Sequence, residues 1–139
     1  MQFSTRTTIA APPDRVWGIL TDLPAWTTWN TTVTSPEGTV ALGRKVTVAV
    51  TANPGRAFAV KVAELVAPSR MVRRGGMPLG LFTGTRTCTL APDAEGTAFE
   101  MTEVYAGPLA GLVTRSIPDL QPSFDEFARC LRSRAEQSA

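Results

Sequence analysis

The hydrophobic periodicity of the chain changes along its length, and this change limits the possible folds more than any other feature of the sequence. Apolar residues recur at every second position between about residues 31 and 105, as in Val46, Val48 and Val50, which predicts β-strands. After Gly107-Pro108 they recur at every third or fourth position, which predicts a helix with one apolar stripe. That stripe consists of Leu109, Val113, Ile117, Leu120, Phe124, Phe127 and Leu131.

The segment before the sheet predicts one strand and two short helices. Residues 2–10 are rich in threonine and β-branched residues and end at a pair of prolines, which is typical of a terminated strand. Residues 13–20 place proline and an aspartate in the first turn of a helix, ahead of apolar positions. A second short helix is expected at 24–29, where Trp26 and Trp29 are three residues apart.

The middle of the chain predicts a meander of six strands. Turn residues at 53–56 join two alternating runs into an antiparallel hairpin. The glycine-rich stretch 75–80 lacks the Lys-Ser/Thr pair of a phosphate-binding loop and is interpreted as a mobile loop at the mouth of a cavity. The strands are expected at about 31–36, 45–50, 58–63, 69–75, 81–91 and 97–106.

Prolines interrupt the apolar stripe at the end of the chain. Pro118 and Pro122 fall inside it, and proline kinks or ends a helix because it lacks an N–H group and clashes with the preceding turn. We therefore expect either one kinked helix or a short piece to about Arg115, followed by a main helix from about 118 to 135. Since this is the longest helix, it is expected to cover the concave side of a curved sheet and to leave a cavity there.

The composition of the chain mainly excludes certain kinds of catalytic and metal site. The 139 residues, of which 43% are hydrophobic, fit a single domain over 1–139. There is no histidine, which removes imidazole acid/base chemistry and nearly every zinc site, so no metal or other cofactor is expected. Cys88 and Cys130 have no Cys-x-x-Cys spacing and are interpreted as free thiols, with Cys88 as a small inert hydrophobic residue.

Charge and hydropathy bear on partners and location. The net charge is only +2 and the basic residues are scattered, which gives weak support for nucleic-acid binding. The chain has neither a signal-peptide pattern nor a run of about 18 apolar residues. We expect a cytoplasmic monomer or homodimer that is not inserted in a membrane.

A short hairpin turn over 93–96 fixes the register of the last two strands. It places apolar pairs on the inward face, and by the same alternation it turns Arg86 and Glu103 inward, directly opposite each other. This pair is open to three interpretations: an ion pair that only satisfies itself, a polar anchor for a ligand, or a catalytic group at Glu103. The expected facing pairs are Pro92/Thr97, Leu90/Phe99, Cys88/Met101, Arg86/Glu103 and Gly84/Tyr105.

Arg73 and Tyr105 are further candidates. Arg73 shares a strand face with Met71, so it is either inward or a surface cation beside Arg74. If Arg73 and Arg86 were both inside, one glutamate could not neutralise them, and an anionic ligand would be favoured. Tyr105 either binds a ligand through its hydroxyl or packs at a rim. The three tryptophans, Trp17, Trp26 and Trp29, are expected in the core rather than in a ligand cage.

Several segments resemble one superfamily. The run from Ile9 to Asp22, the dipeptide Trp29-Asn30, and the stretches 81–86 and 103–109 are similar to the SRPBCC proteins, which include START-like, polyketide cyclase/dehydrase and lipid-transport members. The resemblance implies an α+β, Bet v 1-like helix-grip fold, in which a curved antiparallel sheet of about seven strands wraps around a long C-terminal helix. It departs at Arg86, where many small bacterial members carry histidine, so a fixed cation replaces a titratable group.

Such a fold hosts different functions, so three remain open. The preferred one is binding or transport of a lipid, aromatic or polyketide-like ligand between sheet and helix. The second is a cyclase/dehydratase-like enzyme using Glu103, Arg86 and Tyr105, which the missing histidine disfavours. The third is a protein-interaction module similar to the co-chaperone branch, which would have a filled interior. Expected ligand-binding residues are Val48, Val60, Met71, Arg73, Phe82, Arg86, Met101, Glu103, Tyr105, Leu112, Leu120 and Phe124.

Overall fold

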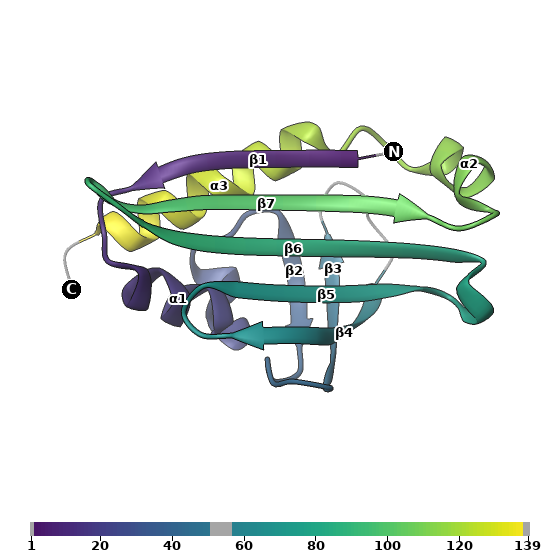
Figure 1. The fold of residues 1–139 in the computed structure, drawn as a ribbon, viewed down its shortest axis with the longest axis horizontal. Helices are drawn as coiled ribbons and strands as arrows, with labels where there is room; N and C mark the ends of the chain where they lie inside the picture. The colour runs from purple at the N-terminus through teal and green to yellow at the C-terminus, as the bar shows by residue number, and fades with distance from the viewer. Residues whose placement is uncertain (1, 51–56, 138–139) are drawn as a thin grey trace.

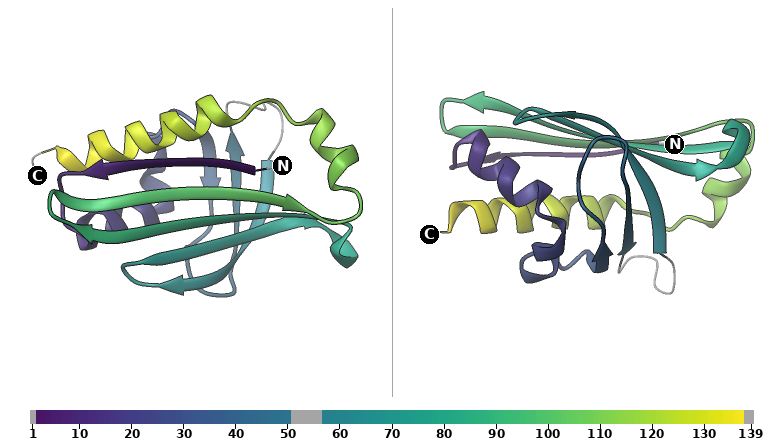
Figure 2. Two further views of the ribbon diagram at one scale, coloured as in Figure 1. Left: turned by 45° about the horizontal axis from the view of Figure 1, so that its top comes forward. Right: turned by 90° about the horizontal axis from the view of Figure 1, so that it is seen from below.

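The computed structural model describes residues 2–50 and 57–137, and in this part of the chain seven strands form one antiparallel sheet (Figure 1). Their order across the sheet is β1-β7-β6-β5-β4-β3-β2. The sheet curls into a half-barrel, because β2, β3 and β4 bend over toward the side on which the C-terminal helix lies (Figure 2). The strands are β1 (Gln2–Ile9), β2 (Val33–Glu37), β3 (Lys45–Val50), β4 (Ala57–Val66), β5 (Arg70–Met77), β6 (Phe82–Asp93) and β7 (Gly96–Ala106).

The long C-terminal helix α3 (Gln121–Glu136) packs against the concave face of this sheet and lies along β1 (Figure 2). The helix α1 (Pro13–Thr21) and the 3-10 helix η1 (Leu23–Thr28) close one end of the half-barrel (Figure 1). At the opposite end lie the turn η2 (Pro78–Gly80), the single-turn helix α2 (Ala110–Val113) and the turn η3 (Thr114–Ser116). The expected α+β helix-grip fold is confirmed.

Aromatic side chains form the core at the closed end. Trp26 is only 1% exposed, and its ring lies 5.4 Å from that of Phe127 on α3, centroid to centroid. Trp29 contacts the same phenylalanine at 5.8 Å. Trp17 and Trp29 are partly buried and pack against the core, so the expectation that the tryptophans are core residues is confirmed.

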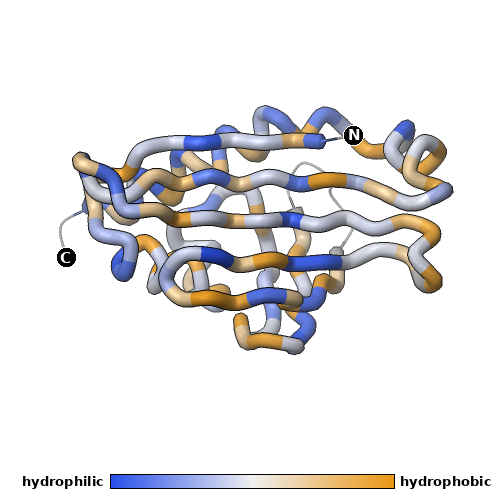
Figure 3. Tube along the Cα trace, in the orientation of Figure 1, coloured by the Kyte–Doolittle hydropathy of each residue, from blue (hydrophilic) through white to orange (hydrophobic). Residues whose placement is uncertain are grey.

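Successive side chains of each strand lie on opposite faces of the sheet, which accounts for the alternation of apolar and polar residues in the sequence. Figure 3 shows hydrophobic and hydrophilic positions following one another along the strands. Val46 pairs with Val60 and Val48 with Phe58, which confirms the antiparallel pairing of β3 and β4. The turn expected at 53–56 lies outside the described residues.

The expectation for the glycine-rich stretch was wrong. Gly75, Gly76 and Met77 belong to β5, and only Pro78–Gly80 turn. Gly76 has a φ of +147°, and a Cβ on it would lie 2.1 Å from the carbonyl oxygen of Phe82. This glycine therefore permits two backbones to approach closely, rather than providing a mobile loop.

The C-terminal helix begins later than expected. Ile117, which precedes a proline, is extended with φ −85° and ψ 127°, as the steric clash with a following proline ring favours. The main helix therefore starts at Gln121 rather than near 118, after a short first piece that ends by Ser116. None of the helices in the described residues combines the length and hydropathy needed to cross a bilayer.

Candidate functional site

A pocket of about 400 Å³ lies between the concave face of the sheet and the C-terminal segment. This volume is within the range of small-molecule sites, roughly 300–1,000 Å³. The described residues that line it are mostly apolar. They are Thr32, Val33, Val48, Ala59, Val60, Arg73, Gly75, Gly76, Phe82, Gly84, Arg86, Met101, Glu103, Tyr105, Val113, Ile117, Leu120, Ser123, Phe124 and Phe127.

Charged side chains form a row across three neighbouring strands on the sheet side of the pocket. Arg73 on β5 pairs in register with Arg86 on β6, and Arg86 pairs with Glu103 on β7. All of the facing pairs expected from the 93–96 turn are present. Since directly opposite residues of an antiparallel sheet lie on the same face, the row follows from the register alone.

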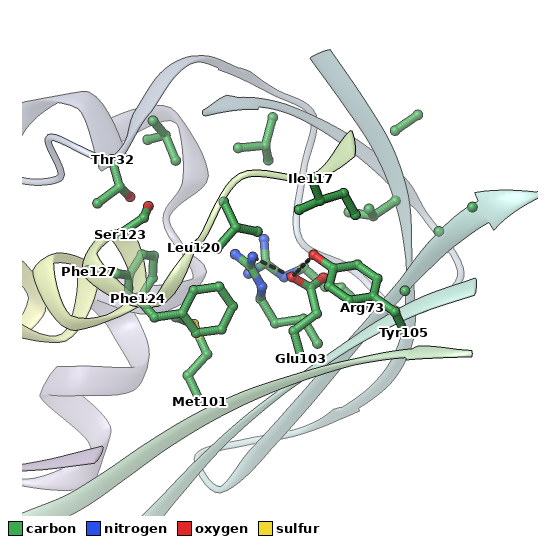
Figure 4. Close-up of a pocket in the computed structure, with 18 of the residues that line it drawn as sticks. Thr32, Arg73, Met101, Glu103, Tyr105, Ile117, Leu120, Ser123, Phe124 and Phe127 are labelled. Carbon is green, nitrogen blue, oxygen red and sulfur yellow. Dashed lines mark hydrogen bonds and ion pairs between the residues drawn. The ribbon is translucent and has the colours of Figure 1, made fainter. Parts of the chain in front are cut away.

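Glu103 is held by two donors. Nη2 of Arg86 donates to its Oε2 at 2.8 Å, and the Tyr105 hydroxyl donates to the same oxygen at 3.1 Å. The side chains of Arg86 and Glu103 are 20% and 14% exposed. Arg86 also makes a cation–π contact with α3, because its guanidinium carbon lies 4.7 Å from the centre of the Phe124 ring. Figure 4 shows Glu103 and Tyr105 facing Leu120 and Phe124 across the pocket.

These contacts set the protonation states. Burial by itself would raise the pKa of Glu103, but the Arg86 charge and the hydrogen bonds from Arg86 and Tyr105 hold that pKa below its ordinary value. Burial and the neighbouring Glu103 carboxylate raise the pKa of Tyr105. Burial lowers the pKa of Arg86, yet Glu103 more than compensates and leaves it raised. At neutral pH the site therefore holds a carboxylate, a neutral phenol and arginine cations.

Arg73 is the less expected member of the row. It is 5% exposed and lines the pocket, so of the two open interpretations the inward one is confirmed. Its guanidinium carbon lies 5.3 Å from the centre of the Trp26 ring. Its Nε and Nη2 atoms are buried without a hydrogen-bond partner among the described residues.

The structure brings together most of the residues expected from the sequence. Two of them are elsewhere: Met71 is 1% exposed inside the core, and Leu112 is 66% exposed. Leu112 is outside because the segment that carries it forms only the single turn of α2, at the end of the half-barrel. The expected residues that do line the pocket are Val48, Val60, Arg73, Phe82, Arg86, Met101, Glu103, Tyr105, Leu120 and Phe124.

Other lining residues were not anticipated. Gly84 lies under the Tyr105 ring, where a Cβ would be 3.2 Å from a ring carbon, and its expected pairing with Tyr105 was a usable signal. Thr32 directly precedes β2, Val33 is its first residue, and Ser123 comes from α3. Their approach depends on how far the sheet curls, for which the sequence has no local signal.

The cysteines and the candidate metal ligands are the remaining groups to place in the described part of the chain. Cys88 and Cys130 are free and buried, and burial raises the pKa of the Cys88 thiol, which makes it a poor nucleophile. No group of three or more His, Cys, Asp or Glu side chains that could hold a metal ion occurs among the described residues.

Known proteins resemble the chain over nearly its whole length. A family model described as polyketide cyclase / dehydrase and lipid transport matches residues 1–136. Protein CV1439 from Chromobacterium violaceum is 19% identical, with a TM-score of 0.72 and 99% of both chains covered. TTHA0849 from Thermus thermophilus is 22% identical, with a TM-score of 0.73 and 97% of both chains covered.

DynU16, a protein in the dynemicin biosynthetic locus, is 20% identical with a TM-score of 0.71. The match covers 98% of this chain and 47% of DynU16. At these identities the solved structures support the fold alone. A search of curated proteins found no match.

Proposed function

The chain belongs to the polyketide cyclase/dehydrase and lipid transport family, and we propose that it binds or transports a small hydrophobic ligand between the sheet and α3. The ligand would be a lipid, an aromatic molecule or a polyketide-like molecule. The observation that carries this proposal is the pocket of about 400 Å³ with a mostly apolar lining. Transfer of apolar ligand surface out of water would supply roughly 25 cal/mol per Å².

The state of Glu103 favours binding over acid/base catalysis. A general base works best with a pKa near the operating pH, whereas Arg86 and Tyr105 hold the pKa of Glu103 below its ordinary value. Its Oε2 atom already accepts two hydrogen bonds. The carboxylate is therefore a weak base with one occupied oxygen, which suits a fixed polar feature of the site better than proton transfer.

The protein-interaction alternative receives less support. It calls for a filled interior, while the pocket leaves space between the sheet and α3. We propose the remaining features as first expected: a monomer or homodimer in the cytoplasm, with a small hydrophobic or aromatic molecule and not a nucleic acid as its partner.

The experiment that tests this proposal fills the pocket from α3. Ser123 is half-buried and lines the pocket, whereas Ser133 is exposed on the same helix, so the pair provides a matched control. Binding of the fluorescent fatty acid cis-parinaric acid is titrated with the wild type, Ser123→Phe and Ser133→Phe. We expect affinity to fall by about tenfold or more in Ser123→Phe, because the ring occupies ligand space.

Ser133→Phe should bind the probe as the wild type does. A wild-type protein that binds neither cis-parinaric acid nor an aromatic probe such as 2-naphthoic acid would contradict the proposal. Equal affinity in both variants would contradict it as well, since the probe would then bind outside the pocket. Circular dichroism of both variants checks that the fold is retained.

A further inference from the structure

Arg73 is a buried cation whose position the fold fixes on both sides. It pairs in register with Val62 of β4 and with Arg86 of β6. Trp26 covers its guanidinium group from the closed end of the half-barrel. Figure 4 shows Arg73 in the same part of the pocket as Glu103 and Tyr105. The side chain is thus held at the polar end of the pocket rather than free to reach solvent.

Arg73 offers a strong donor group that has only a weak partner in the protein. Its Nε and Nη2 atoms are buried without a hydrogen bond of good geometry among the described residues, and the buried Cys88 thiol lies beside the guanidinium group as a weak acceptor. A guanidinium group matches the two oxygens of a carboxylate in a bidentate contact. Since a buried donor without a good partner costs free energy, Arg73 is suited to an acceptor that enters with a ligand.

The charges of the pocket do not balance. Among the described residues that line it, the charged ones are Arg73, Arg86 and Glu103, which leaves one positive charge in excess. Glu103 is engaged by Arg86 and Tyr105 through its Oε2 atom. Burial and the neighbouring Arg86 lower the pKa of Arg73, which reflects the cost of a second cation, although a guanidinium stays charged at neutral pH.

We propose that the ligand is a hydrophobic molecule with a single carboxylate, and that the guanidinium group of Arg73 binds this carboxylate. This inference rests on the proposed function, because it names the chemical class that the same pocket accepts. One negative charge cancels the one excess positive charge, and the apolar lining receives the rest of the molecule. The carboxylate could belong to a fatty acid or to an aromatic or polyketide-like acid.

The test compares acids with their neutral methyl esters in two series. One series is cis-parinaric acid and its methyl ester, and the other is 2-naphthoic acid and its methyl ester. Each probe is titrated at pH 7.5 with the wild type, Arg73→Met and Arg74→Met. Arg74 is the matched control, because it is the next residue of β5 and its side chain is exposed.

We expect the wild type to bind an acid about tenfold or more tightly than its ester in at least one series, as a charge-assisted contact predicts. Arg74→Met should retain this preference. Arg73→Met should bring the ratio of the two affinities close to one while it still binds the ester. The series that shows the preference distinguishes an aliphatic from an aromatic ligand.

Equal wild-type affinities for acid and ester would overturn the inference and leave the proposed function standing, because the pocket would still bind. Retention of the wild-type preference by Arg73→Met would overturn the inference in the same way. Failure of all four probes to bind would overturn both. If Arg73→Met does not fold, Arg73→Lys replaces it, and the preference should then fall below the wild-type value, because an ammonium group cannot offer two parallel donors.

Discussion

At the scale of single residues, Glu103 supplies the counter-charge of the largely buried Arg86. Glu103→Gln keeps the shape of the side chain but leaves Arg86 without a counter-charge in a site where both side chains are largely buried. We expect the free energy of unfolding to fall by roughly 3 kcal/mol, as for other buried pairs that lose one partner. Urea denaturation measures this change.

The control for this variant is Glu100→Gln. Glu100 lies on the same strand and pairs with Arg6 on the outside, where the two side chains are 42% and 81% exposed. An exposed pair contributes little, so we expect a loss below about 1 kcal/mol. Similar losses in the two variants would contradict the account of Glu103.

The same residue predicts a pH dependence. The pKa of Glu103 is lower in the folded protein than its ordinary value. Its stabilising contribution is therefore complete above roughly pH 4.3, the pKa of an unfolded glutamate, and is lost as the pH falls through the lower folded pKa. The difference in unfolding free energy between wild type and Glu103→Gln should stay constant from pH 6 to 8 and shrink below about pH 4. A difference that changes between pH 6 and 8 would point to another group.

Arg73→Met should act in the opposite direction on the ligand-free protein. Methionine fills a similar apolar volume and removes the positive charge that is in excess among the described residues lining the pocket. Replacement of buried ionic groups by well-packed apolar side chains is often neutral or stabilising, by up to about 4 kcal/mol for a whole ion pair, so we expect a melting temperature at or above that of the wild type. Arg74→Met should change it little. A melting temperature below that of the wild type would show that the stacking on Trp26 outweighs the burial cost.

The sequence predicted part of this residue-scale chemistry. A short turn fixes the register of its own hairpin, so the Arg86/Glu103 pair followed from counting residues. The orientation of Arg73 was left open, because Arg73 and Arg74 are adjacent and only Met71 indicated which faces inward. Arg73 and the Trp26 that it contacts are 47 positions apart in the chain, and no local sequence pattern predicts a contact over that separation.

At the scale of elements, the junction of β5 and β6 leaves no room for a side chain at Gly76. Gly76→Ala places a methyl group against the Phe82 carbonyl at a φ of +147°, where an L-residue is strained. We expect a loss of about 1–3 kcal/mol in urea denaturation. The contrasting variant is Gly18→Ala in α1, where the added Cβ would have no heavy atom of a neighbouring segment within 4 Å. Its free energy of unfolding should rise by about 0.5–1 kcal/mol. A neutral Gly76→Ala would contradict the close approach.

Element types could be predicted well, and element ends less so. Alternation and turn residues identified each strand within a few positions, because one face of each is buried. The glycine-rich stretch was misread, since glycine serves equally in a mobile loop and where two backbones touch. Pro118 was correctly expected to interrupt the helix, but the extended Ile117 moved its start to Gln121.

At the scale of the whole molecule, the change in hydrophobic periodicity along the chain, together with the family resemblance, was enough to predict a curved sheet around a C-terminal helix. The pocket itself was expected, but its outline was not. Leu112 was assigned to it and lies outside, while Thr32 and Ser123 line it. These errors share one cause. The curl of the sheet and the position of α3 result from many long-range contacts, whereas hydrophobic periodicity carries only local information.

A crystal structure of the protein with the tightest-binding acid tests the proposed carboxylate contact directly. We expect density for the hydrophobic part between α3 and the concave face of the sheet, with a carboxylate oxygen within about 3 Å of a guanidinium nitrogen of Arg73. The variant Arg74→Met should give the same complex. An acid bound on the outer surface, or in the pocket with its carboxylate turned away from Arg73, would contradict the proposal.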